Sequence, residues 1–291
     1  FETFSIDVSG ETSIDIETLG NTTNSGFNAN NEQFQWWYKL DGGSETNLGS
    51  AFGSGISYTG SLAIEATTID VTGLNNIIVG FTFNMNGGSD GFEDVDVTVT
   101  TTPIAYTFNG TWSPSDPTGN STTNDDIVIS NGDAIISSNT TINGVTVNAG
   151  ASLTVNTAIE LTTNSIDLES TSTSYSSLIN NGTVTGTLTY NRYVSQVAPT
   201  GTNDLITSPF GGQTFGAFAT ANDGVLSASG TLRAFASFNN NSNAYDNYDT
   251  SSNNETVIAS GQGYRAGTIN GETLAFEGTL NNSDLSVPLS V

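Results

Sequence analysis

The chain contains no cysteine and no histidine, and only four of its 291 residues are basic. The missing thiols exclude cysteine nucleophiles and thiolate metal clusters, and the missing imidazoles exclude Ser-His-Asp triads and histidine zinc sites. Two chemistries remain open to such a chain. A pair of carboxylates can hydrolyse a glycosidic bond, and oxygen ligands can hold calcium.

Positive charge is the next scarce feature. The formal net charge is −25, and the only cations are Lys39, Arg192, Arg233 and Arg265. Nucleic-acid binding needs clustered cations against phosphates, so we expect no nucleic-acid partner. Such an acidic surface favours solubility and the binding of cations.

Long apolar runs are absent as well. No stretch is long enough to span a bilayer, so direct membrane insertion is not expected. The sequence shows no signal peptide and begins at Phe1, which predicts a mature, processed or excised segment. The missing cysteines leave the redox compartment open.

What is present is Gly, Ser, Thr, Asn and Asp, with charged residues at only 11% and hydrophobic residues at 35%. Gly, Asn and Asp adopt the special conformations of tight turns. A disordered chain lacks aromatic and β-branched residues, whereas here they recur in alternation. No window shows a helical apolar period. The sequence therefore predicts a folded all-β protein in which helix is scarce.

Residues 1–102 form the first predicted domain. Val95, Val97 and Val99 share one strand face, while Asp94 and Asp96 lie on the other. The same alternation occurs at 4–8 and 77–85, and glycine-rich turns at 41–43 and 86–88 separate the strands. We interpret this region as a jelly-roll β-sandwich.

Residues 103–192 form the second predicted domain. Short apolar triplets recur every six to eleven residues, separated by Asn, Gly or Ser, at 127–129, 134–136, 145–147, 153–155, 159–161 and 166–168. Such brief strands are typical of the rungs of a right-handed β-solenoid.

Residues 193–291 form the third predicted domain, a β-sandwich-like module. Alternation at 233–238 and 273–277 predicts strands, and the stretch 239–255 between them predicts a long polar loop. The boundary at 192 has an alternative, because residues 183–194 (TVTGTLTYNRYV) also fit a single strand that bridges both modules.

Three phrases carry a resemblance: residues 125–155 (DDIVISNGDAIISSNTTINGVTVNAGASLTV), 168–194 (LESTSTSYSSLINNGTVTGTLTYNRYV) and 261–281 (GQGYRAGTINGETLAFEGTLN). They resemble a module of large secreted proteins of Bacteroidetes, especially flavobacteria. This resemblance implies type IX secretion, an extracellular or cell-surface location and the role of an adhesin or of part of a multi-domain surface enzyme. The first region resembles MAM, laminin-G or carbohydrate-binding jelly rolls, whose last strand often carries an Asp beside a structural calcium.

Two adjacent tryptophans stand in residues 31–43 (NEQFQWWYKLDGG). Neighbours on a strand point to opposite faces, so Trp36 enters the apolar face and Trp37 joins Gln35 and Lys39 on a mixed face. An aromatic ring between polar groups suits sugar binding, with the pyranose stacked on the indole. The alternative is that a neighbouring loop or domain covers Trp37.

Four carboxylates are the candidate calcium ligands, namely Asp7, Asp90, Asp94 and Asp96. Asp94 and Asp96 are about 7 Å apart along an ideal strand, too far to share one ion without a bulge. Loop carbonyls near Asp90 and a carboxylate of the first strand would complete the six to eight oxygens that calcium takes. The alternative is a solvated acidic strand face that discourages edge pairing.

Tyr245 and Tyr248 lie in the long polar segment of the third region. Loops rich in tyrosine and asparagine suit adaptable recognition, and a poorly ordered excursion is the alternative.

The sequence thus predicts a non-catalytic extracellular protein for adhesion or ligand display. Its expected partner is a polysaccharide or a cell-surface ligand, and calcium would stiffen it. Weak sites repeated in an array would gain avidity. Two alternatives remain: ancillary modules of a secreted hydrolase whose catalytic domain lies outside this segment, and a structural filament subunit that self-associates.

Overall fold

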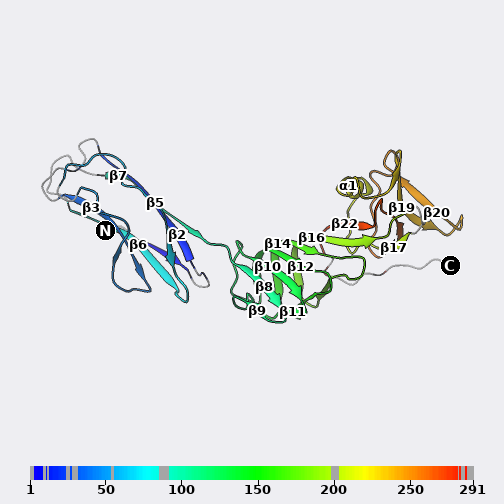
Figure 1. Ribbon diagram of the computed structural model, residues 1–291, viewed down its shortest axis with the longest axis horizontal. Helices are drawn as coiled ribbons and strands as arrows, with labels where there is room; N and C mark the ends of the chain where they lie inside the picture. The colour runs from blue at the N-terminus through cyan, green and yellow to red at the C-terminus, as the bar shows by residue number, and fades with distance from the viewer. Residues whose placement is uncertain are drawn as a thin grey trace. The chain divides into compact units, whose positions relative to one another are not determined.

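The computed structural model describes residues 3–8, 11, 13–23, 27, 32–53, 56–84, 92–197, 203–280, 282 and 286. The chain is nearly all β, as the composition and the alternation predict, and it divides into two compact units at residue 103 (Figure 1). Unit 1 covers residues 1–103 and unit 2 covers residues 104–291.

Unit 1 is a pair of antiparallel sheets around one apolar core. One sheet has the order β1-β6-β3-β4 and the other β5-β2-β7. Their bounds are β1 Thr3–Asp7, β2 Ser13–Thr22, β3 Gln33–Leu40, β4 Thr46–Asn47, β5 Ile64–Asp70, β6 Asn76–Asn84 and β7 Phe92–Thr101. The jelly-roll assignment stays a prediction that is finer than this two-sheet arrangement.

Alternation decides which side chains enter the core of unit 1. Ile14 and Ile16 of β2 face Trp36 of β3 and Val79 of β6 in a single buried cluster. The three valines of β7 pack against the same cluster, with Asp94 and Asp96 outside. Every second residue of a strand points inward, so the alternating apolar residues of the sequence form the inner faces of the two sheets.

Unit 2 begins as a two-sheet β-solenoid. The first sheet has the order β22-β16-β14-β12-β10-β8-β9, in which β8, β10, β12, β14 and β16 pair in parallel. At its two ends, β9 and β22 (Glu272–Gly278) pair in antiparallel fashion. The second sheet is parallel and has the order β11-β13-β15 (Figure 1). The bounds are β8 Ala105–Asn109, β9 Trp112–Ser113, β10 Asp126–Asn131, β11 Asp133–Ile136, β12 Thr140–Val147, β13 Ser152–Val155, β14 Glu160–Leu168, β15 Ser177–Asn180 and β16 Thr183–Val194.

The rungs stack their apolar residues in register. Ile127 pairs with Val145, Val145 with Ile166, and Ile166 with Leu188. Parallel neighbours in register place equivalent side chains above one another. These four apolar side chains therefore stack into a continuous buried column. The predicted solenoid-like stacking is therefore present, except that the triplet at 166–168 and residues 160–161 of the triplet before it belong to the single strand β14 and not to two short ones.

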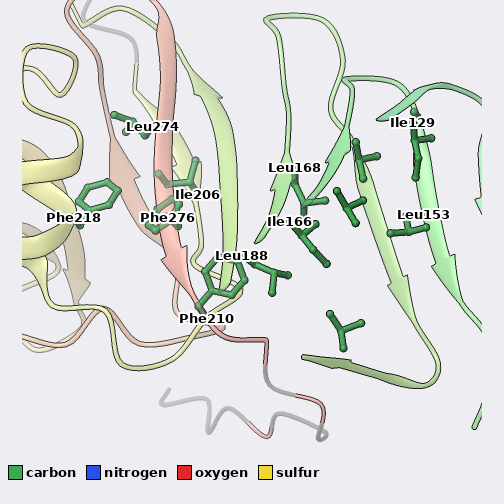
Figure 2. Packing of buried hydrophobic residues seen from close by; sticks show 14 of the residues in the cluster. Ile129, Leu153, Ile166, Leu168, Leu188, Ile206, Phe210, Phe218, Leu274 and Phe276 are labelled. Atoms are coloured by element: carbon green, nitrogen blue, oxygen red, sulfur yellow. The ribbon is translucent and has the colours of Figure 1, made fainter. Parts of the chain in front are cut away.

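The predicted boundary at 192 lies inside β16. The whole segment 183–194 is one strand, and it pairs in antiparallel fashion with β22 (Glu272–Gly278). Residues 104–291 accordingly share one core, which runs from Ile129 and Ile166 through Leu188 and Phe210 to Phe276 (Figure 2).

The last part of unit 2 packs one helix against a small sheet. The helix α1 (Phe215–Ala221) begins at Thr214, whose hydroxyl accepts the Ala217 N–H at 3.2 Å. The sheet contains β17 Asp204–Ile206, β18 Ala228–Ser229, β19 Leu232–Asn239, β20 Ala244–Asp249 and β21 Tyr264–Ala266. Strand β20 lies inside the stretch 239–255, where we expected only a loop.

Candidate functional site

The first candidate, Trp37, lies on the outer face of β3 and is 3% exposed. Its Nε1–H donates to Thr82 Oγ1 at 2.9 Å, and the Lys39 ammonium lies 5.1 Å from its ring centroid. Trp36 faces the core, where its Nε1–H donates to the Leu62 carbonyl at 2.7 Å. In this conformation Trp37 offers a sugar no free ring face.

Gln35 and Lys39 are engaged by their own unit. Gln35 Nε2 donates to the Trp36 carbonyl at 2.6 Å and to the Leu48 carbonyl at 3.4 Å. Lys39 Nζ forms an ion pair with Glu45 Oε1 at 3.2 Å. These contacts explain the mixed face of β3 without a ligand.

Tyr248 and Tyr245 are separated by the pleat of β20. Tyr248 points inward, is 8% exposed and packs against Phe215, Phe235 and Tyr264. Tyr245 lies three residues earlier and therefore points to the outer face, because an odd spacing reverses the side of a strand. Of the two predicted ligand-binding tyrosines, only Tyr245 lies on the surface.

Tyr245 belongs to a group of stacked side chains on the outer face of the sheet. Phe238, its partner across β19 and β20, lies edge to face with it at 5.1 Å between centroids. The Arg265 guanidinium carbon lies 4.5 Å from the Tyr245 ring, and Arg265 Nη2 donates to Asn247 Oδ1 at 2.8 Å. Phe238 is nevertheless 44% exposed.

The strand register extends this face to β17. Leu205 pairs with Arg265, and Arg265 pairs with Ala236, which pairs in turn with Asn247. Paired residues lie on the same side of a sheet, so Leu205, which is 71% exposed, shares the outer face. We call this surface the platform; its residues are Leu205, Phe238, Tyr245, Asn247 and Arg265.

A hollow of about 420 Å³ borders the platform. Arg265 and Asn247 belong to both, and the rest of the lining is Val197, Asn203, Ser227, Ala228, Ser229, Leu232, Arg233 and Ala234. Two of the four cations of the chain thus line one hollow, beside the exposed ring of Phe238 and the half-buried ring of Tyr245. Six of its ten lining residues are polar, so the hollow offers mainly hydrogen-bonding groups to a ligand.

The platform was only partly visible in the sequence. Tyr245 was predicted, whereas Phe238, Asn247, Arg265 and Leu205 were not. Arg265 carried the one available signal, as a rare cation in an acidic chain. The strand pairing that brings Arg265 to Tyr245 links residues about twenty positions apart, so no local sequence pattern indicates this contact.

The candidate calcium ligands lie on two different sheets. Asp7 is on β1, while Asp94 and Asp96 are exposed on β7. A bulge falls between Glu93 and Asp96, and Asp94 has a φ of 54° there. Asp90 lies outside the described residues. Within the described residues no three acidic, His or Cys side chains form a metal-binding group. Calcium stays a prediction.

Among the described residues, no helix is long and apolar enough to cross a membrane. In comparisons with known proteins, no family model, curated protein or solved structure matches the chain.

Proposed function

We propose that this chain is a non-catalytic extracellular binding protein, and that its platform holds a sugar ring of a polysaccharide or a cell-surface glycan. The observation that carries the proposal is the pair of outward rings, Phe238 and Tyr245, beside Arg265 and a hollow. A pyranose presents a C–H face to an aromatic ring, while guanidinium and amide groups donate to its hydroxyls.

The backing of the platform supports the proposal. On the other side of the same strands, Phe235 and Tyr264 stack at 4.7 Å in the buried core. Exposed rings on strands that are fixed by such a core lose little conformational freedom on binding. Adhesion follows if several copies or several sites act together, because linked weak sites gain avidity.

The test is a glycan array probed with the full chain and with Tyr245→Ala and Phe238→Ala. We expect each variant to weaken binding by about tenfold, since an anchor of this type contributes more than 1 kcal/mol. Tyr175→Ala is the matched control, because Tyr175 also stacks with an arginine, Arg192 at 5.3 Å, but does not line the hollow beside the platform.

Unchanged binding in both platform variants would overturn the proposal, as would the absence of any bound glycan. Calcium has a separate test. We expect a chelator to lower the melting temperature of unit 1 if Asp7, Asp90, Asp94 or Asp96 holds the ion, and an unchanged temperature removes structural calcium.

A further inference from the structure

The only charged residues that line the hollow beside the platform are two arginines. None of its ten lining residues is acidic, although the chain has 29 acidic and only four basic residues. Arg233 and Arg265 both line it. Two cations gathered where no carboxylate lines the wall create a local field opposite in sign to the rest of the surface.

Neither arginine is neutralised by an ion pair. The ion pair of the described residues between Lys39 and Glu45 involves neither of them. Arg265 is held by the Tyr245 ring and the Asn247 amide oxygen. Arg233 Nη1 donates to the carbonyls of Gly230 and Leu232, at 2.9 and 3.4 Å. Backbone and amide oxygens orient both groups without cancelling their charge.

Two carboxylates lie near Arg233, those of Asp249 and Asp223. Asp249 feels the charge of Arg233, and its Oδ1 accepts bonds from Ser251 while its Oδ2 accepts the Thr231 hydroxyl. Asp223 borders Arg233 in a separate hollow with Thr250 and Asn254. Neither carboxylate is among the residues that line the hollow beside the platform.

We propose that the platform binds an acidic polysaccharide, with a sugar carboxylate or sulfate in the hollow lined by Arg233 and Arg265. This inference rests on the proposed glycan-binding function and names its substrate class. Guanidinium matches the paired oxygens of a carboxylate or a sulfate. Because Arg265 belongs to both platform and hollow, one residue positions the ring and the acid of the same sugar.

The size of the hollow agrees with this assignment. Its volume of about 420 Å³ lies within the range of small-ligand pockets. Ser227 and Ser229 also line it, and serine hydroxyls suit the hydroxyls of a sugar.

The experiment is calorimetry of the full chain in about 150 mM salt, which screens the repulsion between the acidic protein and an acidic ligand beyond about 8 Å. The probes are polygalacturonate against its methyl ester, and a sulfated galactan against the same galactan after desulfation. We expect the acidic form of one pair to bind at least about tenfold more tightly, since a charge-assisted hydrogen bond contributes more than 1 kcal/mol. The pair that responds identifies the carboxylate or the sulfate.

The variants are Arg265→Gln and Arg233→Gln, with Arg192→Gln as the matched control because Arg192 stacks on Tyr175 away from the hollow. We expect the first two to lose the preference for the acidic form and the control to keep it. Arg265→Lys should retain part of the preference, since it keeps the charge without the forked donors, and it answers the case in which a glutamine variant misfolds.

Two failures are distinguishable. Equal binding of acidic and neutral forms, still abolished by Tyr245→Ala, overturns the acidic substrate and leaves the proposed function standing. Binding of neither form, together with an empty glycan array, overturns both.

Discussion

Two cation–aromatic pairs on outer sheet faces, one in each unit, have opposite fates. In unit 1, Lys39 lies 5.1 Å from the Trp37 ring, and the indole is 3% exposed. In unit 2, Arg265 lies 4.5 Å from the Tyr245 ring, beside an open hollow and the exposed Phe238. A cation beside an aromatic ring on an outer sheet face therefore does not by itself leave that ring accessible to a ligand.

The cross-strand neighbour explains the difference. Trp37 pairs with Gly80, which has no side chain, and the indole reaches over β6 to Thr82. Tyr245 pairs with Phe238, and two large rings at one position of the ladder support each other edge to face. A glycine partner lets a ring lie close to its sheet, whereas an aromatic partner keeps it outward.

The largest expected effect comes from removing the ring that lies on its sheet. Trp37→Ala should cost about 3–5 kcal/mol of unit 1 stability, because it empties a buried volume and leaves Thr82 without its donor. Tyr245→Ala should cost under about 1 kcal/mol in unit 2. Urea denaturation followed by circular dichroism measures both. Equal losses of unfolding free energy in the two variants would contradict the claim that Trp37 is buried and Tyr245 lies on the surface.

The next effect separates the two tyrosines of β20. Tyr248→Ala should destabilise unit 2 by about 3 kcal/mol, since the ring packs against Phe215 and Phe235 in the core. Tyr248→Phe keeps that packing and serves as the control. A thermal melt of each variant decides. If Tyr248→Ala melts like Tyr245→Ala, the two rings do not lie on opposite faces.

A smaller effect concerns the buried phenol behind the platform. Burial raises the pKa of Tyr264 above its ordinary value of 10.0. Above about pH 10 the unfolded chain therefore loses this proton first, and stability falls until the pH passes the folded pKa. Melting temperatures from pH 9 upward should decline less steeply in Tyr264→Phe, with Tyr175→Phe as the exposed control. Identical slopes in all three proteins would contradict a protected phenol.

The smallest effect is expected for Lys39, the cation beside the buried Trp37 ring. Lys39→Gln should cost under about 1 kcal/mol, because its bond with Glu45 lies at the surface. A double-mutant cycle with Glu45→Gln measures the pair alone. A coupling well above this value would mean that Lys39 is essential to closing the face over Trp37.

Much of the fold was predictable because it depends on local alternation. The alternating valines of β7 and the apolar triplets of the solenoid predicted their strands. The absence of a helical apolar period predicted that helix would be scarce. The helix α1 has only seven residues, too few for a pattern, and β20 was hidden by its polar composition.

The candidate site was less predictable because it depends on pairing. Tyr245 and Tyr248 look equivalent in the sequence, and only the strand pleat of β20 separates surface from core. Phe238 and Arg265 reach Tyr245 from two other strands, and nothing local connects them.

By itself, the sequence determined the all-β class, the two-faced strands of unit 1 and the stacked rungs of unit 2, because side chains alternate along any strand. It also determined the scarcity of cations, so that each arginine strongly affects the local electrostatic potential of an otherwise acidic surface. The tertiary structure alone decided which aromatic rings face outward and brought Arg233 and Arg265 to the lining of one hollow. Those outcomes depend on which residues face each other across strands, and hydrogen-bonded register sets this between segments that are distant along the chain.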